Sequence, residues 1–346
     1  MNIFEADSGN EAWLSAARRL MTSEDVQSHT GRGGATRELL PALFILTSPR
    51  DRWVVSRLPP INVAFALAEA VWIIRGRNDS NFLNFWNSQL PNYAGPGKTY
   101  HGAYGHRLRI HYGIDQLNRV FQGLWSNPNT RQGVLQIWDP RIDLPIDSGE
   151  PVAMDIPCNI CSLLEIRDGK LMWTQIMRSN DLYLGTPYNF VQFTILQEVM
   201  AGWLNLEPGP YYQLSNSLHA YVRDLKKINN SLPEISIPKN DESLAVPKIE
   251  SEKAWEEIER LVDSLLRDEV GEAQLPAAVN RNALPQAYKS ILAVLAAEYA
   301  RRRRWHESAG EVIGVCSNRC LRLLWERWCG RSKVKAVKEE RTCHQS

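Results

Sequence analysis

The chain has 346 residues, of which 44% are hydrophobic, so it is long enough for one large catalytic domain with an extension. Its 40 Lys and Arg balance 39 Asp and Glu, which excludes the overall basic field that generic nucleic-acid binding requires. The six cysteines are too scattered for a disulfide framework and no apolar run has membrane length, so we expect a cytoplasmic protein with reduced thiols and no membrane contact.

The first informative element is residues 62–74, which are apolar almost all round and rich in good helix formers. This composition predicts a buried helix whose only charge is Glu69. A carboxylate buried alone indicates either a partner elsewhere in the chain or a functional site.

The middle of the chain predicts a β-hairpin followed by a helix. Residues 162–166 and 171–177 have the composition of strands, and Asp168-Gly169 between them is a strong signal for a two-residue turn. Residues 132–138 predict a further strand. Beyond the hairpin we expect a second buried helix at 190–204, a break at Pro208-Gly209-Pro210 and a strand at 211–214.

The composition changes after about residue 228, where a polar, proline-punctuated stretch begins. Apolar residues at helical spacing then predict helices at 250–269, 284–305 and 315–328. We therefore divide the chain into a catalytic domain (1–228), a loop or linker (229–249), a helical appendage (250–330) and a flexible tail (331–346).

Candidate reactive residues cluster around the hairpin. Cys158 follows a proline and precedes a strand, which is a weak signal alone, because a free cysteine is more often a small core residue than a nucleophile. Arg178 and Asp181 follow the second strand, where a guanidinium can lower the pKa of a thiol or bind a phosphate. Asn189 stands at the start of a predicted helix, where the ordinary role of an asparagine is that of a cap.

Together these motifs resemble the core of the thymidylate synthase family, with its Pro-Cys before a strand, its Arg-Ser-x-Asp and its Leu-Gly-x-Pro-x-Asn. The resemblance covers about residues 30–225 and includes a Glu-x-x-Trp helix, a Tyr-Gly pair and a His-x-Tyr motif, which begin here at Glu69, Tyr104 and His219. It implies an α+β fold with a twisted mixed sheet and long buried helices. The sheet face would form a homodimer, and the C-terminal helices would be an addition.

The chemistry of these residues suits the transfer of a one-carbon unit to C5 of a pyrimidine nucleoside 5′-monophosphate. C5 of a uracil ring is a poor nucleophile, so the Cys158 thiolate must add at C6 to turn C5 into an enolate carbon. Asn189 can hydrogen-bond the O4 and N3 edge of the base, which stabilises this enolate. Glu69, on its apolar helix, is suited to move protons through water.

The resemblance also implies a carbon donor and a set of binding residues. The donor is methylenetetrahydrofolate, held by Asp181, Gly185 and Trp72. The catalytic set is Cys158, Glu69, Asn189, Asp181 and Tyr104. The sugar hydroxyl is held by His219 and Tyr221, and the phosphate by Arg178, Ser179, Arg32 and Arg131. Arg131 would reach the site from a second subunit, which implies the homodimer.

Several departures from the family pattern bear on the reaction. Gln132 stands where the family has a second arginine, and Ser215-Asn216-Ser217 replaces Gly-Gly-Asp, which makes a ribonucleotide substrate conceivable. The paired tryptophans that stack on the folate have no counterpart near Leu90-Pro91, and the usual apolar C-terminal residue is missing. Both losses open a methylene intermediate to water. Against a hydroxymethylase stands Asn189, because deoxycytidylate hydroxymethylases resemble this site with an aspartate there.

We therefore expect methylation of deoxyuridylate or a related uracil nucleotide. The first alternative is 5-hydroxymethylation of a uracil or cytosine nucleotide, in which water replaces hydride. The second is a non-catalytic homologue that binds nucleotide.

Other sequence features give weaker signals. Cys158-x-x-Cys161 is half of a zinc motif, but no second pair stands at finger spacing, so we expect no metal. The arginines at 301–304 end a predicted helix, which favours a solvated basic face over a nucleic-acid site.

Overall fold

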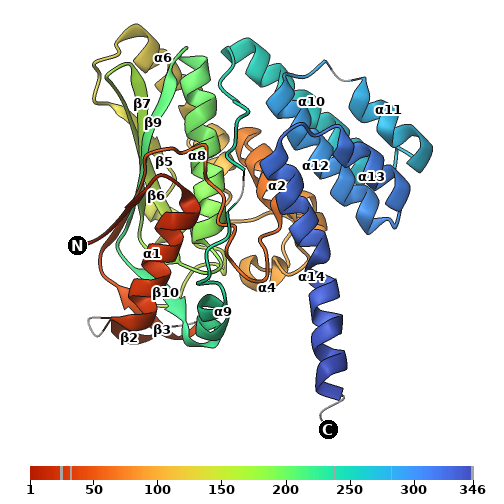
Figure 1. Ribbon diagram of the computed structural model, residues 1–346. Helices are drawn as coiled ribbons and strands as arrows, with labels where there is room; N and C mark the ends of the chain where they lie inside the picture. Colours follow the sequence, from red (N-terminus) through yellow and green to blue (C-terminus); the bar gives the residue numbers. More distant parts are fainter. Residues whose placement is uncertain (24–25, 32, 237, 282, 344–346) are drawn as a thin grey trace.

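The computed structural model describes residues 1–23, 26–31, 33–236, 238–281 and 283–343, with side chains as far as Arg331. Its centre is a six-stranded mixed sheet in the order β1-β4-β9-β7-β6-β5 (Figure 1). These strands are β1 (Asn2–Ala6), β4 (Ala42–Leu46), β9 (Glu207–Ser215), β7 (Lys170–Met177), β6 (Asn159–Arg167) and β5 (Gly133–Gln136). The α+β class expected from the sequence is confirmed.

A smaller sheet continues from the ends of β7 and β9, because two of its strands follow them in the chain. Its order is β2-β3-β10-β8, and its members are β2 (Gln27–Gly31), β3 (Gly34–Leu39), β10 (Leu218–Tyr221) and β8 (Asn180–Asp181). The junction of the two sheets therefore brings together the chain segments that follow Met177 and Ser215.

The predicted hairpin is confirmed. Asp168 and Gly169 have φ values of 49° and 69°, the left-handed backbone that a tight two-residue hairpin requires at both positions. Strand β6 begins at Asn159, earlier than expected, so Cys158 directly precedes its first residue.

Two long buried helices pack against each other over the large sheet. Helix α2 (Val63–Ile74) is capped by Asn62, whose Oδ1 accepts the N–H of Phe65 at 3.1 Å. Helix α8 (Thr186–Trp203) begins four residues earlier than predicted, because Pro187 is well suited to the first turn of a helix. Both helices were expected from their apolar composition.

The prediction of a break at Pro208-Gly209-Pro210 is wrong in one respect, since all three residues lie inside β9. Prolines lack the N–H that a ladder needs. The side chain of Gln197 from α8 compensates, since its Nε2 donates to the carbonyl oxygens of Leu171 at 3.0 Å and Gly209 at 2.8 Å. The strand therefore starts before its prolines rather than after them.

The remaining helices of this part are mostly short and were not predicted. Helix α1 (Gly9–Thr22) is the longest, and Ser8 and Glu11 form a capping box at its start. The others are α3 (Ser80–Trp86), α4 (Pro91–Ala94), α5 (Tyr104–His106), a π-helix (Arg107–His111), α6 (Gln116–Ser126), α7 (Pro140–Asp143), a 3-10 turn (Val222–Asp224) and α9 (Leu225–Asn230).

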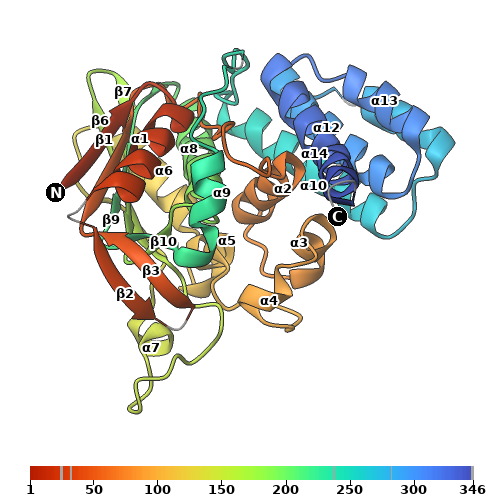
Figure 2. The same cartoon turned by 60° about the horizontal axis from the view of Figure 1, so that its bottom comes forward.

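The C-terminal helices form one group (Figures 1 and 2). They are α10 (Lys248–Leu266), a 3-10 turn (Glu272–Gln274), α11 (Leu275–Asn280), α12 (Gln286–Arg302), α13 (His306–Gly314) and α14 (Arg319–Cys343). Of these, α10, α12 and α14 lie beside α2, and the others pack beyond α12. The three predicted helices correspond to α10, α12 and α14. Helix α14 starts at 319, because Asn318 accepts the N–H of Leu321 as a cap, and it continues through most of the predicted tail.

Ion pairs connect these helices to the catalytic part. Arg75, just after α2, bonds Glu259 at 2.6 Å, and Arg77 bonds Asp263 at 2.8 Å. Arg301 and Arg302 pair with the buried Glu298 rather than forming an open basic face. The boundaries at 228 and 250 remain predictions from composition. Among the described residues, no helix combines the length and apolarity that crossing a bilayer takes.

The polar stretch between α9 and α10 crosses α8 as an extended segment held by one buried carboxylate. Glu198 of α8 is 1% exposed, bonds Arg52 and Arg50, and accepts the N–H of Leu244 at 3.0 Å. Although burial alone would raise the pKa of Glu198, the charge of Arg52 holds it below its usual value. Glu198 therefore joins the N-terminal part, α8 and the segment leading to the appendage.

Replacing Glu198 with alanine should lower the free energy of unfolding by about 3–5 kcal/mol, because Arg52 would be left buried without its partner. Glu207→Ala is the matched control, since Glu207 also pairs with Arg50 but is 65% exposed, and it should cost less than about 1 kcal/mol. Chemical denaturation of both variants measures the difference. Equal effects would contradict the role of Glu198.

Candidate active site

Strand register brings the predicted reactive residues to one end of the large sheet. Asn159 at the start of β6 pairs with Met177 at the end of the antiparallel β7. Met177 in turn pairs with Ser215 at the end of the parallel β9. The residues that flank these positions, Cys158 and Arg178, therefore lie side by side, and the N–H of Arg178 donates to the carbonyl oxygen of Cys158 at 2.9 Å.

The guanidinium of Arg178 holds the chain that leads into Cys158. Its Nε donates to the carbonyl oxygen of Pro157 at 2.8 Å, and one Nη donates to that of Ile156 at 3.1 Å. The same group lies 5.5 Å from the ring centre of Trp138. Cys158 is half-buried, and the guanidinium of Arg178 lies against the backbone that directly precedes it.

Ser179, Asp181, His219 and Tyr221 meet where β8 and β10 pair. His219 stands opposite Asp181, and its Nδ1 is 3.5 Å from the hydroxyl of Ser179. Burial lowers the pKa of His219, and the carboxylate of Asp181 acts against this shift. The ring of Tyr221 stands edge-on to His219 at 5.3 Å. These four predicted residues are therefore neighbours.

Asp181 also shapes the turn before α8. Its Oδ1 accepts the N–H groups of Tyr183 at 2.7 Å and Leu184 at 2.9 Å. Burial raises the pKa of the Asp181 carboxyl, and the N–H of Leu184 opposes the rise. One oxygen of the carboxylate is therefore committed to the loop that leads to Gly185.

Asn189 lies in the first turn of α8 and does not cap it, because the cap position is Gly185. Its Nδ2 donates to Oδ1 of Asn180 at 3.2 Å, and Asn180 is held in turn by Ser215 at 3.1 Å and Thr186 at 3.0 Å. This bond uses one amide hydrogen of Asn189, so its carbonyl oxygen and its second amide hydrogen can still accept and donate one hydrogen bond each. Asn180 was missed in the sequence because it occupies the variable position of Arg-Ser-x-Asp.

Glu69 contributes a buried carboxyl from α2. Its Oε2 is inaccessible to solvent and has no hydrogen-bond partner among the described residues. Burial raises the pKa of Glu69 to about 8, and a hydrogen bond with Gln192 of α8 opposes the rise. Gln192, one turn after Asn189, was not identified from the sequence. An unpartnered buried oxygen of this kind indicates a ligand or ordered water beside it.

Tyr104 connects Glu69 to the nucleophile. Desolvation, together with negative charge at Cys158, raises the pKa of the Tyr104 hydroxyl well above its usual range. Charge at Asp155 and Glu69 acts in the same direction, so these side chains lie around one phenol. The structure thus brings together three of the predicted catalytic residues and adds Asp155.

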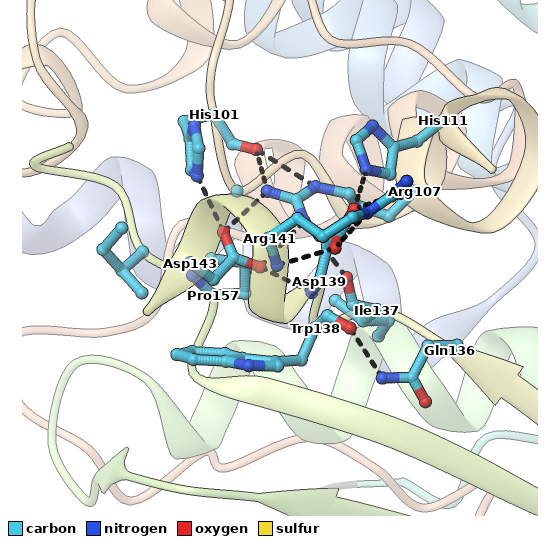
Figure 3. A network of polar contacts seen from close by, with 12 residues as sticks. His101, Arg107, His111, Gln136, Ile137, Trp138, Asp139, Arg141, Asp143 and Pro157 are labelled. Carbon is cyan, nitrogen blue, oxygen red and sulfur yellow. Dashed lines mark hydrogen bonds and ion pairs between the residues drawn. The ribbon is translucent and has the colours of Figure 1, made fainter. Parts of the chain in front are cut away.

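A buried polar network, shown in Figure 3, lies next to Pro157 and Trp138. Arg107 is 1% exposed and bonds Asp143 at 2.8 and 3.0 Å, and His101 bonds the same carboxylate at 2.7 Å. Burial would raise the pKa of Asp143, but the hydrogen bond from Arg107 keeps it below its usual value. A parallel pair joins His111 to Asp139 at 2.8 Å. The two histidines therefore belong to a polar network that lies beside Pro157 and Trp138.

Two predicted residues are not brought into this cluster, and a third cannot be placed. Arg131 is exposed in the loop before β5 and makes no hydrogen bond or ion pair with any described residue. Trp72 is 5% exposed, and its indole N–H donates to the carbonyl oxygen of Asp79 at 3.0 Å, so little of its ring is open to a ligand. Arg32 lies outside the described residues, and no three metal-binding side chains are grouped among those that are described.

This arrangement suits an enzyme that transfers a one-carbon unit to a pyrimidine nucleotide. The sequence profile described as Thymidylate synthase matches residues 54–261, which is more than half of the chain. The chain belongs to the thymidylate synthase family, as its motifs indicate, and it is a transferase of methyl or hydroxymethyl groups.

Individual relatives refine this comparison. The chain is similar to the deoxyuridylate hydroxymethyltransferase of Bacillus phage SP01, with 32% identity over 267 residues, which are 69% of each chain. The protein of the same name from Pseudomonas phage M6 is 35% identical over 190 residues, 54% of this chain and 53% of its own. The thymidylate synthase of Vesicomyosocius okutanii is 25% identical over 195 residues, 55% of this chain and 69% of its own. The chain spans about half to two thirds of these relatives.

The raised pKa of Glu69 predicts a specific pH dependence of stability. A folded-state pKa of about 8 against an ordinary value of 4.5 means that the folded protein holds this proton more tightly, so the contribution of Glu69 to stability is lost as pH rises between these values. The free energy of unfolding of the wild type, minus that of Glu69→Gln, should fall by about 1 kcal/mol per pH unit between about pH 5 and 8. A difference that stays constant with pH would disprove the shift.

Proposed function

We propose that this protein is a deoxyuridylate hydroxymethyltransferase, which moves the methylene carbon of methylenetetrahydrofolate to C5 of deoxyuridylate and completes the group with water. The observation that carries the proposal is the name shared by the two phage relatives, which exceed the thymidylate synthase in identity. The orientation of Asn189 supports a uracil base. This reverses the order of the two products that the sequence suggested.

The chain's own residues account for activation of the base. Cys158 adds to C6, and its thiolate is favoured by the guanidinium of Arg178. Asn189 donates to O4 as negative charge develops there. Methylenetetrahydrofolate supplies the carbon at the oxidation level of formaldehyde. The unpartnered Oε2 of Glu69 suits a water or a folate nitrogen and can move a proton to or from it.

The position of Trp86 supports access of water to the methylene carbon. The resemblance leads one to expect tryptophans that stack on the folate, but Trp86 is fully buried. Its carbonyl oxygen accepts from Asn62 at 2.8 Å and Arg302 at 2.6 Å, so this residue serves the packing of α3 against the appendage. Trp86 is therefore not open to stack on a folate, which supports water over hydride as the group that completes the transfer.

Mass spectrometry of products tests this function. The protein is incubated with methylenetetrahydrofolate and, separately, deoxyuridylate, deoxycytidylate, uridylate or cytidylate. We expect a hydroxymethyl group on deoxyuridylate, tetrahydrofolate as the other product, and no turnover with Cys158→Ala, because this variant lacks the thiolate proposed to add at C6. A methyl group together with dihydrofolate would instead establish the synthase reaction.

Binding of the nucleotide is proposed to use Arg178 and Ser179 for the phosphate, with Arg32 and Arg131, and His219 and Tyr221 for the sugar. Arg131 cannot do this within one chain as it stands, since it is exposed before β5. A homodimer through the large sheet would supply a second copy. Side chains of β7 alternate between buried and half-exposed, which is typical of a sheet with helices on one face only.

The open face of this sheet is apolar, which supports dimerisation. Its exposed members include Ile3, Val134 and Leu163, which are 57%, 43% and 39% exposed. Contiguous apolar surface on a sheet of this size ordinarily marks a protein contact. Because a two-fold interface places each chain's loops near the partner, the loop before β5 is suited to carry Arg131 into the neighbouring site.

Complementation between two inactive variants tests the shared site. Cys158→Ala and Arg131→Ala are each expected to lose activity alone. In mixed dimers one site has both residues, so random exchange of subunits should restore about a quarter of the wild-type activity. A mixture no more active than the separate variants would show that Arg131 does not serve the partner.

A further inference from the structure

Asp155 is a half-buried carboxylate beside the nucleophile to which the mechanism above gives no task. It lies three residues before Cys158. Its Oδ2 accepts the N–H of Gly102 at 2.8 Å, which is its one hydrogen bond among the described residues. A Cβ at Gly102 would lie 3.0 Å from both carboxylate oxygens, so the backbone there approaches the carboxylate closely. Gly102 is two residues from Tyr104, and the contact thus ties Asp155 to the catalytic cluster.

The surroundings of Asp155 contain charges of both signs. The negative charge of Asp155 raises the pKa of the phenols of Tyr100 and Tyr104. Negative charge at Cys158 also raises the pKa of the Tyr104 phenol. Burial raises the pKa of Asp155, and the Gly102 N–H, His101 and Arg107 oppose the rise, whereas Asp143 adds to it. His101 and Arg107 make their short contacts with Asp143 (Figure 3), so they favour an ionised Asp155 without pairing with it directly.

We propose that Asp155 is the general base that deprotonates the water which attacks the methylene carbon at C5. This assignment rests on the proposed hydroxymethyltransferase function. The water oxygen bonds to the methylene carbon as one O–H bond breaks and its proton moves to the Asp155 carboxylate. The electron pair of the exocyclic double bond shifts to O4. It then returns to form the C5–C6 double bond, and the C6–S bond breaks to release the Cys158 thiolate.

The step balances without an oxidant or a reductant. Once its CH2 group has left, the folate needs two hydrogens, one on each of the two nitrogens that held the group, to become tetrahydrofolate. One corresponds to the proton lost from C5 and the other to the proton that Asp155 takes from water. Glu69 is less suited to this task, because its pKa of about 8 keeps it protonated near neutral pH, which favours a role as a proton donor.

The variant Asp155→Asn tests the proposal, since its side-chain oxygen can still accept the Gly102 N–H. Formation of hydroxymethyl product should fall by about 100-fold or more, as expected for loss of a general base. The covalent complex of Cys158 with 5-fluorodeoxyuridylate and methylenetetrahydrofolate should form as in the wild type, because it stops before water attacks. Asp147→Asn, at an exposed position in the preceding loop, is the control and should change neither.

Two further readouts separate a base from a residue that only supports the fold. With Asp155→Asn, the methylene carbon should persist long enough for added 2-mercaptoethanol to capture it as a thioether at C5. In the wild type, protonation of Asp155 should lower the rate as the pH falls, and this decline should be absent from Asp155→Asn.

The opposite results overturn the proposal. Loss of the fluorinated complex together with the product would make Asp155 structural, and product within about twofold of wild type would assign the base elsewhere. If the wild type makes only methyl nucleotide and dihydrofolate, the proposed function itself fails and the base assignment with it.

Discussion

The site depends on the register among β6, β7 and β9. Ladder bonds that pair Asn159 with Met177, and Met177 with Ser215, place Cys158 beside Arg178 at one sheet end. A slip of one residue would turn every side chain of a strand to the other face and separate these groups. The irregularity of β6 directly after Asn159 marks the point where the ladder gives way to the site, a common use of a bulge. The strand pairing therefore determines which side chains meet at the site.

Burial then sets the protonation states at this sheet end. Glu69, Asp155 and Asp181 all have pKa values raised by desolvation, whereas that of His219 is lowered, so every group is shifted toward its neutral form. The carboxyl groups differ in the polar and charged groups that surround them. Glu69 faces an amide on an apolar helix, but Asp155 lies near the cations His101 and Arg107. A site that has one protonated and one ionised carboxyl group can donate a proton and accept another in the same reaction.

The parts of the fold and of the site that depend on neighbouring residues could be predicted from the sequence, and the parts that depend on contacts between distant residues mostly could not. The turn at Asp168-Gly169 and the apolar helices are encoded by neighbouring residues, and the motifs carried the family, which the comparison confirms. Strand β9 was misjudged because Gln197, distant in sequence, satisfies the carbonyl groups around its prolines. Asp155 was missed for the same reason, since it contacts Gly102, which is distant in sequence, whereas Asn180 was missed because it occupies the variable position of its motif.

If water, and not hydride, completes the transferred group, the oxygen of the product comes from solvent, whatever residue activates it. The reaction should be run in water enriched in oxygen-18 and the nucleotide analysed by mass spectrometry together with the folate. We expect one heavy oxygen in a hydroxymethyl nucleotide, and tetrahydrofolate as the folate product. A methyl nucleotide without the label, formed together with dihydrofolate, would show that hydride and not water completes the group.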